Sequence, residues 1–238
     1  MVIRSRFRNR ALTAGGIFVI SSVLIWELAA VVVGVQNTGT IRGLVTIDTV
    51  PDKVMVKVTT DQSVCGDEVE DQATVVDPSG GVANAVVIVA GVPWGDIAPE
   101  PIINNVGCYF VPRVQVARTL SQVTVTSQDE TLHTTHAYDD RQRTSFNIAI
   151  PVPGFEIKRP LRRPGVVRIE CDSHGWMRGW VYVTGDVGTV SRTDGSFELS
   201  GIPAGTYKLL IWHERYEGMP QQVTVTGGTI TEVNFQLE

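Results

Sequence analysis

The stretch Cys171-Asp-Ser-His174-Gly-Trp-Met177 places a thiolate, an imidazole and a thioether at C-x2-H-x2-M spacing. Strand-like runs flank it at residues 165–170 and 179–184. A tight loop between two strands can direct all three side chains toward one point. Cysteine sulfur, histidine nitrogen and a weak axial methionine sulfur are three of the four ligands of a trigonal type 1 copper centre. The stretch therefore predicts most of a copper site, with a second histidine still to be found.

A candidate for that histidine lies upstream, in Thr131-Leu-His133-Thr-Thr-His136. A lone Met is usually core filler, and a lone Cys is often a small buried hydrophobe. Together, between two strands and with this upstream segment, the residues favour copper over coincidence. Zinc can occupy the same ligands, because it accepts Cys and His in tetrahedral geometry.

The sequence carries no signature of a catalytic site. It has no G-x-S-x-G, no phosphate-binding glycine loop and no H-E-x-x-H. A four-ligand copper site of this kind is also coordinatively filled and leaves no position for a substrate. His213 follows Trp212 at the end of a strand-like run, and we interpret it as structural. We therefore expect a protein that is not an enzyme.

Composition and patterning indicate an all-β protein. The chain has 238 residues, of which 23 are glycine, and 43% are hydrophobic. No stretch of 12 residues after position 40 has helical periodicity, whereas polar and apolar residues alternate at 114–117 and 122–126. We expect a loop at 91–107, which is rich in Gly, Pro and Asn. Strands are expected at 41–47, 54–59, 83–90, 109–112, 114–117, 122–126, 145–151, 165–170 and 179–184.

The amino terminus predicts a membrane anchor. Four arginines between positions 4 and 10 precede an apolar run from 11 to 35. A run of about 25 residues can cross a bilayer as a helix, and the arginines should stay on the cytoplasmic side. The alternative is a cleaved signal peptide, for which Leu28-Ala-Ala30 is a poor cleavage site. We expect residues 1–36 to form the cytoplasmic tip and a single span in the inner membrane.

Glu27 is the one acidic residue inside this apolar run. It either lies near the outer interface, where a carboxylate costs little, or faces a partner helix in the membrane.

Charge and cysteine content agree with an exported protein that does not bind nucleic acid. Without the four arginines and Glu27, 16 basic and 24 acidic residues remain, which is a net charge of −8. An exported protein with three cysteines usually pairs two of them. If Cys171 is a metal ligand, Cys65 and Cys108 form the disulfide, which joins a long loop to the body.

Residues 101–185 resemble a cupredoxin, an amicyanin- or plastocyanin-like type 1 copper domain. The resemblance is carried by Tyr109-Phe-Val-Pro112, by Pro164-Gly165 before the Cys strand, and by the C-x2-H-x2-M loop. It implies a Greek-key sandwich with ligands His133, Cys171, His174 and Met177, and His136 as a neighbour that is not a ligand.

Two residues beside these ligands are unusual for the family. Thr134 stands where the family has an Asn that hydrogen-bonds to the Cys loop, and Trp176 lies inside that loop. Both are expected to influence the metal, because groups that hydrogen-bond to ligands orient and tune a site.

A second, smaller β-sandwich is expected from residues 40–100 plus 186–238. Thr193-Asp-Gly195 and Ile202-Pro-Ala-Gly205 resemble turns of the transthyretin-like domain that accompanies some carboxypeptidases, and Ile41-Arg-Gly43 is similar to its first strand. The cupredoxin would then be inserted in this domain; two tandem sandwiches are the alternative.

These observations lead to three hypotheses. The first is a membrane-anchored, periplasmic or extracytoplasmic cupredoxin that binds one type 1 copper and passes electrons to a cytochrome or a membrane electron-transfer complex. His174 would be the electron gateway, with Trp176 and Trp180 shaping the docking face. The second is an accessory subunit of a respiratory or photosynthetic membrane complex, in which the cupredoxin fold is a docking platform. The third is copper storage or delivery.

Overall fold

The structure is a computed structural model that describes residues 37–95 and 98–238. The expected anchor and Glu27 lie outside the described residues. The described residues form one compact unit. Within the described residues, no helix has the length and apolar character needed to span a bilayer.

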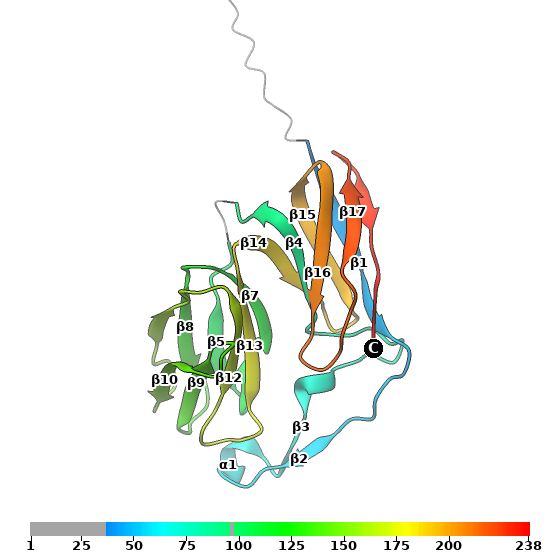
Figure 1. The fold of residues 1–238 in the computed structure, drawn as a ribbon. Coiled ribbons are helices and arrows are strands. Elements are labelled where there is room, and N and C mark those ends of the chain that lie inside the picture. The colour runs from blue at the N-terminus through cyan, green and yellow to red at the C-terminus, as the bar shows by residue number, and fades with distance from the viewer. Residues whose placement is uncertain (1–36, 96–97) are drawn as a thin grey trace, which may run out of the picture. The chain divides into compact units, whose positions relative to one another are not determined.

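Strands between residues 102 and 184 form two sheets (Figure 1). One has the order β10-β9-β12-β13-β7, and the other has the order β11-β8-β5-β6. The strands of the first are β7 (Val114–Arg118), β9 (His133–Tyr138), β10 (Thr144–Ile150), β12 (Gly165–Glu170) and β13 (Arg178–Thr184). Those of the second are β5 (Ile102–Val106), β6 (Tyr109–Val111), β8 (Gln122–Ser127) and β11 (Ile157–Pro160).

The core of these two sheets follows from alternation along each strand. In β9, His133, Thr135 and Ala137 are fully buried, whereas the residues between them are half-exposed. Successive strand residues point to opposite faces, so this pattern directs one face of β9 to the core. The same core contains Cys171 and Met177. The predicted metal ligands therefore belong to the hydrophobic core.

Strands from both ends of the described chain form two further sheets. One contains β1 (Thr38–Ile47), β15 (Ser196–Pro203), β18 (Ile230–Glu232) and β19 (Phe235–Leu237). The other has the order β14-β4-β16-β17, with β4 (Val86–Pro93), β14 (Asp186–Val190), β16 (Gly205–Trp212) and β17 (Gln221–Val225). Early strands thus pair with late ones, β1 with β15 and β4 with β14 and β16. Ile41, Phe197 and Phe235 belong to their shared core.

A short segment between β1 and β4 departs from the expected ranges. It contains β2 (Met55–Lys57), α1 (Gln62–Cys65), β3 (Glu68–Glu70) and a 3-10 turn, η1 (Gln72–Thr74). We expected all of residues 40–100 in the second sandwich. Instead Val58, Cys65 and Val69 pack into the core of residues 102–184. The reason is covalent as well as apolar, since the predicted Cys65–Cys108 disulfide is present.

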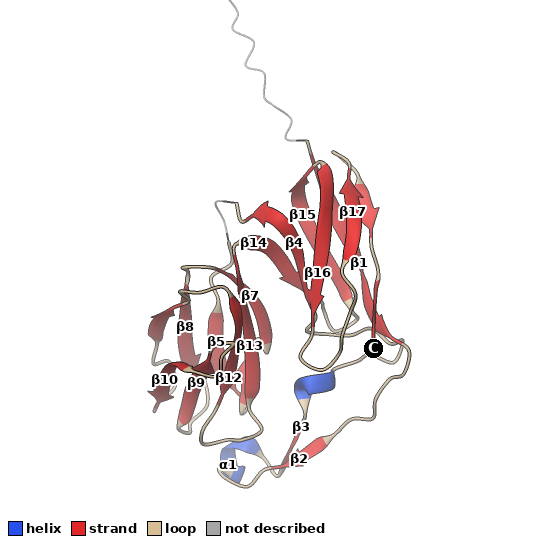
Figure 2. Cartoon of the chain, viewed as in Figure 1, coloured by secondary structure: helices blue, strands red, loops and turns tan. Residues whose placement is uncertain are grey.

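The expected loop at 91–107 is wrong in its second half, which forms strand β5 (Figure 2). β5 pairs in parallel with β8. The buried Asn105 Nδ2 donates a hydrogen bond to the Thr126 carbonyl oxygen at 2.7 Å. A partner strand about 20 residues away pairs with the backbone of β5 and accepts from Asn105 Nδ2, which the local composition did not indicate.

The core of residues 102–184 contacts the remaining sheets through a third apolar cluster. Its buried members are Val86, Ile88, Val114 and Val116. Trp180 packs against this cluster with its ring 5.5 Å from that of Trp212. We expected Trp180 to shape a docking face beside the metal loop, and the structure places it in this contact instead.

Candidate metal centre

Three predicted ligand atoms meet at one point in the core. Cys171 Sγ lies 3.6 Å from His174 Nδ1 and 3.9 Å from His133 Nδ1, and the two nitrogens are 3.1 Å apart. The three side chains are buried. Metal–sulfur and metal–nitrogen bonds of about 2.3 and 2.0 Å at trigonal angles would separate sulfur from nitrogen by about 3.7 Å and the nitrogens by about 3.5 Å. The two observed sulfur–nitrogen distances lie close to this value, and the observed nitrogen–nitrogen distance of 3.1 Å is shorter than the trigonal one.

The backbone explains why residues 133 and 171–177 converge. His133 begins β9, which pairs with β12, and Cys171 directly follows β12. The loop closes on itself, because Cys171 N donates to the Met177 carbonyl at 3.3 Å and Met177 N donates to that of His174 at 2.9 Å. Met177 is buried in the same core, with 1% of its surface exposed.

Thr134 joins the two ligand segments. Its backbone N–H lies 3.4 Å from Cys171 Sγ, and its hydroxyl lies 3.7 Å from the same sulfur. The hydroxyl oxygen also accepts a hydrogen bond from Asp172 N at 2.6 Å. Thr134 therefore bridges to the Cys loop, the role that the resemblance gives to an Asn.

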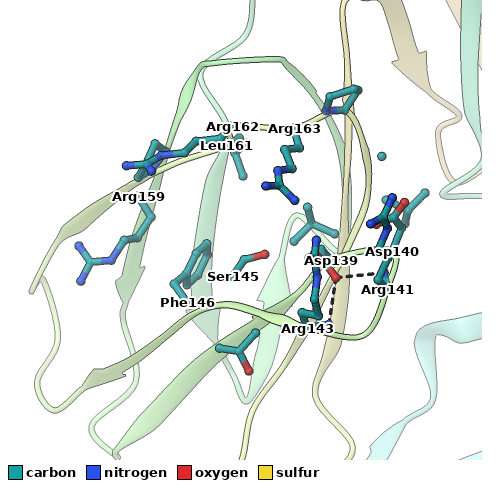
Figure 3. A pocket seen from close by; sticks show the side chains of 16 residues that line it. Asp139, Asp140, Arg141, Arg143, Ser145, Phe146, Arg159, Leu161, Arg162 and Arg163 are labelled. Carbon is teal, nitrogen blue, oxygen red and sulfur yellow. Dashed lines mark hydrogen bonds and ion pairs between the residues drawn. The ribbon is translucent and has the colours of Figure 1, made fainter.

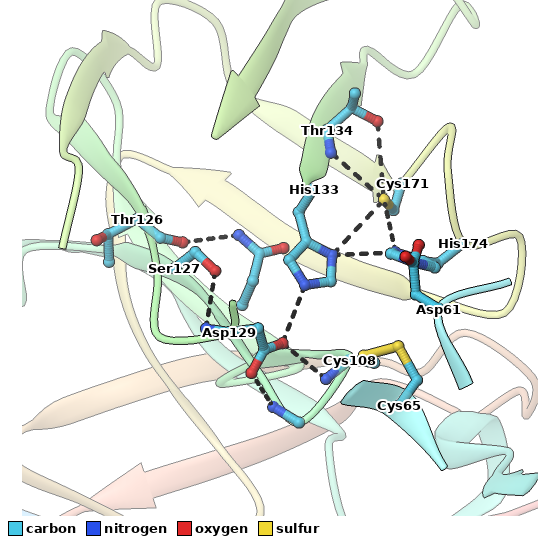
Figure 4. A network of polar contacts seen from close by, with 12 residues as sticks. Asp61, Cys65, Cys108, Thr126, Ser127, Asp129, His133, Thr134, Cys171 and His174 are labelled. Carbon is cyan, nitrogen blue, oxygen red and sulfur yellow. Dashed lines mark hydrogen bonds and ion pairs between the residues drawn. A yellow bond between two sulfur atoms is a disulfide. The ribbon is translucent and has the colours of Figure 1, made fainter. Parts of the chain in front are cut away.

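Each of the two candidate ligand histidines contacts a carboxylate (Figure 4). His133 Nε2 lies 2.9 Å from Asp129 Oδ2, and His174 Nε2 lies 2.9 Å from Asp61 Oδ2. A carboxylate accepts hydrogen bonds, so each ring carries its proton on Nε2 and leaves Nδ1 free to bind a metal. Burial, and then the neighbouring His174, lowers the pKa of His133, which further favours the neutral ring.

Asp129 and Asp61 were both missed in the sequence. Asp129 lies four residues before His133 and also accepts backbone hydrogen bonds from Gly107 and Cys108. Its only sequence signal is this proximity. Asp61 lies 113 residues before His174 and belongs to a separate segment. The one sequence feature that pointed toward its position was the expected disulfide of Cys65, which joins a long loop to the body.

The remaining predicted residues lie around this centre. Trp176 Nε1 donates to the Cys108 carbonyl at 3.2 Å, and its ring is 5.1 Å from that of His174. His136 points away from the ligands and contacts Asp172 at 3.0 Å and Thr144 at 2.8 Å. The side chain of His174 has no exposed surface, and its expected role as the electron gateway stays a prediction.

The donor set fits a soft metal better than a hard one. One thiolate and two imidazoles suit copper or zinc, and a buried thioether in the same loop suits copper. With the proton of each ring on Nε2, the two Nδ1 atoms 3.1 Å apart would face each other with their lone pairs in repulsion. A cation between them converts this repulsion into attraction, so the geometry fits a metal ion.

His213 is buried away from the ligand triangle. Its Nδ1 accepts a hydrogen bond from Arg215 N at 3.2 Å, and its ring stacks on Tyr216. Burial lowers its pKa to about 4. These contacts agree with a structural role.

No family model and no curated protein matches the chain. Among solved structures, similar ones are a purple cupredoxin from Nitrosopumilus maritimus (21% identity, 36% of this chain and 100% of that chain, TM-score 0.32) and a reduced Cu(I) form of an amicyanin variant (14% identity, 41% and 98%, TM-score 0.31). A Cu-containing nitrite reductase from Thermus scotoductus is also similar (18% identity, 39% and 25%, TM-score 0.30). The solved structures that the chain is similar to here are thus cupredoxins or contain copper.

Proposed function

We propose that the chain is a membrane-anchored, extracytoplasmic cupredoxin-like protein that binds one type 1 copper ion and transfers single electrons. The observation that carries this proposal is the buried triangle of Cys171 Sγ and the Nδ1 atoms of His133 and His174. Copper bound there would supply a one-electron couple.

The chain's own residues would hold the ion in a fixed geometry. Cys171 would give the thiolate bond, the two histidines the equatorial nitrogens, and Met177 the weak axial contact. Asp129, Asp61 and Thr134 hold these ligands from behind. A buried, hydrogen-bonded ligand set changes little in shape when the charge of the ion changes, and this favours electron transfer over substrate chemistry.

An optical and EPR titration of the purified full chain with Cu(II) tests this function, with Cys171→Ser as the control. We expect an intense thiolate-to-copper band and narrow hyperfine splitting at one equivalent of copper, both absent from the Ser variant. Folded wild-type protein with reduced Cys171 and no such band would overturn the assignment.

A second candidate function is an accessory subunit of a membrane electron-transfer complex, with or without copper. The burial of His174 favours it, because a covered ligand edge is poorly placed for exchange with a freely diffusing partner. Purification in mild detergent tests it: a stable complex with other membrane proteins is expected, and a chain that always migrates alone contradicts it.

A further inference from the structure

The metal centre is covered by residues 58–69, which we call the lid. Thr60 Oγ1 donates to the Ser173 carbonyl in the ligand loop at 3.2 Å, and Asp61 contacts His174 at 2.9 Å. Val58, Cys65 and Val69 anchor the lid in the core beneath. The lid is therefore fixed to the loop on one side and to the core on the other.

The disulfide connects the two carboxylates that hold the ligand histidines (Figure 4). Asp129 accepts the backbone N–H of Cys108 at 2.8 Å, and the carbonyl of Asp61 accepts the N–H of Cys65 at 2.9 Å. A continuous chain of contacts thus runs from His133 through Asp129, the Cys108–Cys65 bridge and Asp61 to His174.

Asp61 is held in an uncommon backbone conformation. Its φ is 53° and its ψ is 36°, in the left-handed region that non-glycine residues seldom adopt. Such a conformation costs free energy of order 1 kcal/mol and persists where surrounding contacts enforce it. Here the Asp61 carbonyl accepts the N–H groups of Val64 and Cys65, Cys65 is bonded to Cys108, and the Asp61 carboxylate contacts His174.

We propose that Asp61 is a positioning residue for the metal ligand His174 and that the Cys65–Cys108 disulfide keeps it in place by holding the lid closed. This inference builds on the proposed copper function. The closed lid makes the carboxylate of Asp61, rather than the ring of His174, the group that reaches solvent: the Asp61 side chain is 43% exposed and that of His174 is 0% exposed.

Two substitutions separate contact from charge. Asp61→Asn keeps an oxygen that accepts from His174 Nε2 but removes the negative charge, whereas Asp61→Ala removes both. Asp67→Asn is the matched control, because it makes the same chemical change at an exposed position of the lid with no side-chain hydrogen bond among the described residues. Cys65→Ser/Cys108→Ser opens the bridge. The bridge closes a loop of 43 residues and so constrains the unfolded chain, and this variant is therefore measured only where it remains folded.

The first readout needs no metal. Diethyl pyrocarbonate modification of the metal-free full chain is followed by tryptic mass spectrometry, because cleavage after Arg168 and Arg178 leaves His174 as the single histidine of its peptide. A hydrogen bond to a charged group is worth about 1.5–3 kcal/mol, so Asp61→Ala should raise the rate at His174 about tenfold or more. The disulfide variant should also raise it. Asp67→Asn should not, and His213, buried elsewhere, should stay constant in all variants.

The second readout is the reduction potential of the copper-loaded chain. Both Asp61 variants should have a raised potential, because the carboxylate stabilises the more positive oxidation state, and Asp67→Asn should match wild type. Equal rates of His174 modification in wild type and Asp61→Ala would contradict the proposal that the lid shields His174. Copper bound with an unchanged potential in both Asp61 variants would overturn the positioning role. Failure of wild type to bind copper would instead refute the proposed function. The modification rates of the metal-free chain would still test whether the lid shields His174.

A separate observation concerns the other end of the same sheets. A cavity of about 770 Å³ lies between the edge strands β10 and β11 (Figure 3). It is remote from the metal centre, because residues 139–143 follow the far end of β9 from His133 and residues 161–164 precede the far end of β12 from Cys171. Phe146, Leu161 and Val167 give it apolar lining.

Positive charge gathers around this cavity although residues 37–238 are acidic. Five arginines line it, at positions 141, 143, 159, 162 and 163, against Asp139 and Asp140. Arg143 is occupied by Asp139 at 2.6 Å, which holds the pKa of that carboxyl at about 2. The other four arginines have no ion pair among the described residues. The five arginines exceed the two aspartates in the lining, and a bound anion would offset this excess of positive charge.

We infer that this cavity binds a phosphate-bearing ligand with an apolar portion. Several guanidinium forks match the oxygens of a multivalent phosphate, and the apolar lining matches an attached carbon skeleton. A cavity of this volume is the size that small-molecule ligands occupy.

Calorimetric titration of the full chain with pyrophosphate at low salt tests this site. Saturable binding is expected, weakened about tenfold or more in Arg162→Gln/Arg163→Gln, since two charge-assisted bonds are lost. Arg118→Gln/Arg192→Gln, which removes equal charge elsewhere, should bind like wild type. Sedimentation with phosphatidic acid vesicles, against phosphatidylcholine vesicles, distinguishes a lipid headgroup from a soluble phosphate. No saturable heat with pyrophosphate, or equal weakening in both double variants, would overturn the proposal.

Discussion

Thr134 on β9 and Cys171 in the loop directly after β12 share one hydrogen-bond system at the candidate metal centre. The hydroxyl of Thr134 accepts from the N–H of Asp172, the residue after Cys171, at 2.6 Å, and it lies 3.7 Å from the sulfur of Cys171 itself. One short side chain thus contacts both the loop backbone and the sulfur of Cys171. This relationship makes residue 134 the most direct test of how the loop is held.

Thr134→Val keeps the shape of the side chain and removes its hydroxyl. The Asp172 N–H then loses its acceptor, which should lower the free energy of unfolding by about 1–3 kcal/mol. Copper affinity should fall about 10–100-fold, the usual effect of losing a group that orients a ligand. Urea unfolding and chelator competition measure these changes. Thr134→Ser retains the hydroxyl and should resemble wild type; a Ser variant as weak as Val would contradict the bridging role.

Asp129→Asn should weaken the hydrogen bonding that positions His133, whereas removing a charge from an exposed neighbouring residue should not. The buried carboxylate accepts from Gly107 N, Cys108 N and His133 Nε2, and an amide would turn a donor toward one of these donors. We expect a loss of about 2–3 kcal/mol in stability and of about 10–100-fold in copper affinity. Glu130→Gln, an exposed neighbour, provides the control and should change neither quantity measurably.

Arg113 and Glu214 form an ion pair that is almost fully buried. Their side chains are 7% and 4% exposed, with Nη2 and Oε1 2.7 Å apart. Removing one partner leaves the other charge buried and unpaired, so Arg113→Met or Glu214→Leu should each cost about 3–5 kcal/mol. The double variant should be less destabilised than the sum of the two singles. Urea denaturation of all four proteins completes this cycle, and strict additivity would show that the pair is not coupled.

His213 should make the protein less stable in mild acid. Its pKa falls from the ordinary 6.5 to about 4 in the fold because burial disfavours the charged ring. Below about pH 6.5 the unfolded chain binds a proton that the folded chain does not, so stability is complete above this pH and is lost as pH falls toward 4. This loss amounts to about 2–3 kcal/mol by pH 4.5.

The matched measurement is urea unfolding of metal-free wild type and His213→Asn at pH 7 and pH 4.5. The difference between the two proteins removes the titration of other groups. His213→Asn should lose less stability on acidification than wild type does. Equal losses in the two proteins would show that His213 does not titrate in this way.

Local sequence determined the strands, the ligand loop and the disulfide partners. Alternation of polar and apolar residues in runs such as 114–117 and 122–126 reflects the two faces of a strand. The C-x2-H-x2-M spacing indicates which sulfur and nitrogen atoms the loop offers to a metal. The strands and the ligand loop depend on neighbours within a few residues, and the disulfide followed from the count of three cysteines once Cys171 was assigned to the metal. They could therefore be predicted without knowing which segments meet in space.

The tertiary structure alone decided what surrounds the ligands. Asp61 reaches His174 from 113 residues away, and β5 became a strand because β8 satisfied its backbone. Trp180 packs beside Trp212 rather than on a docking face, and residues 58–69 joined a core that their sequence position did not indicate. Hydrogen bonds, burial and charge pairing act through space, so pairings between distant segments leave no local pattern in the chain.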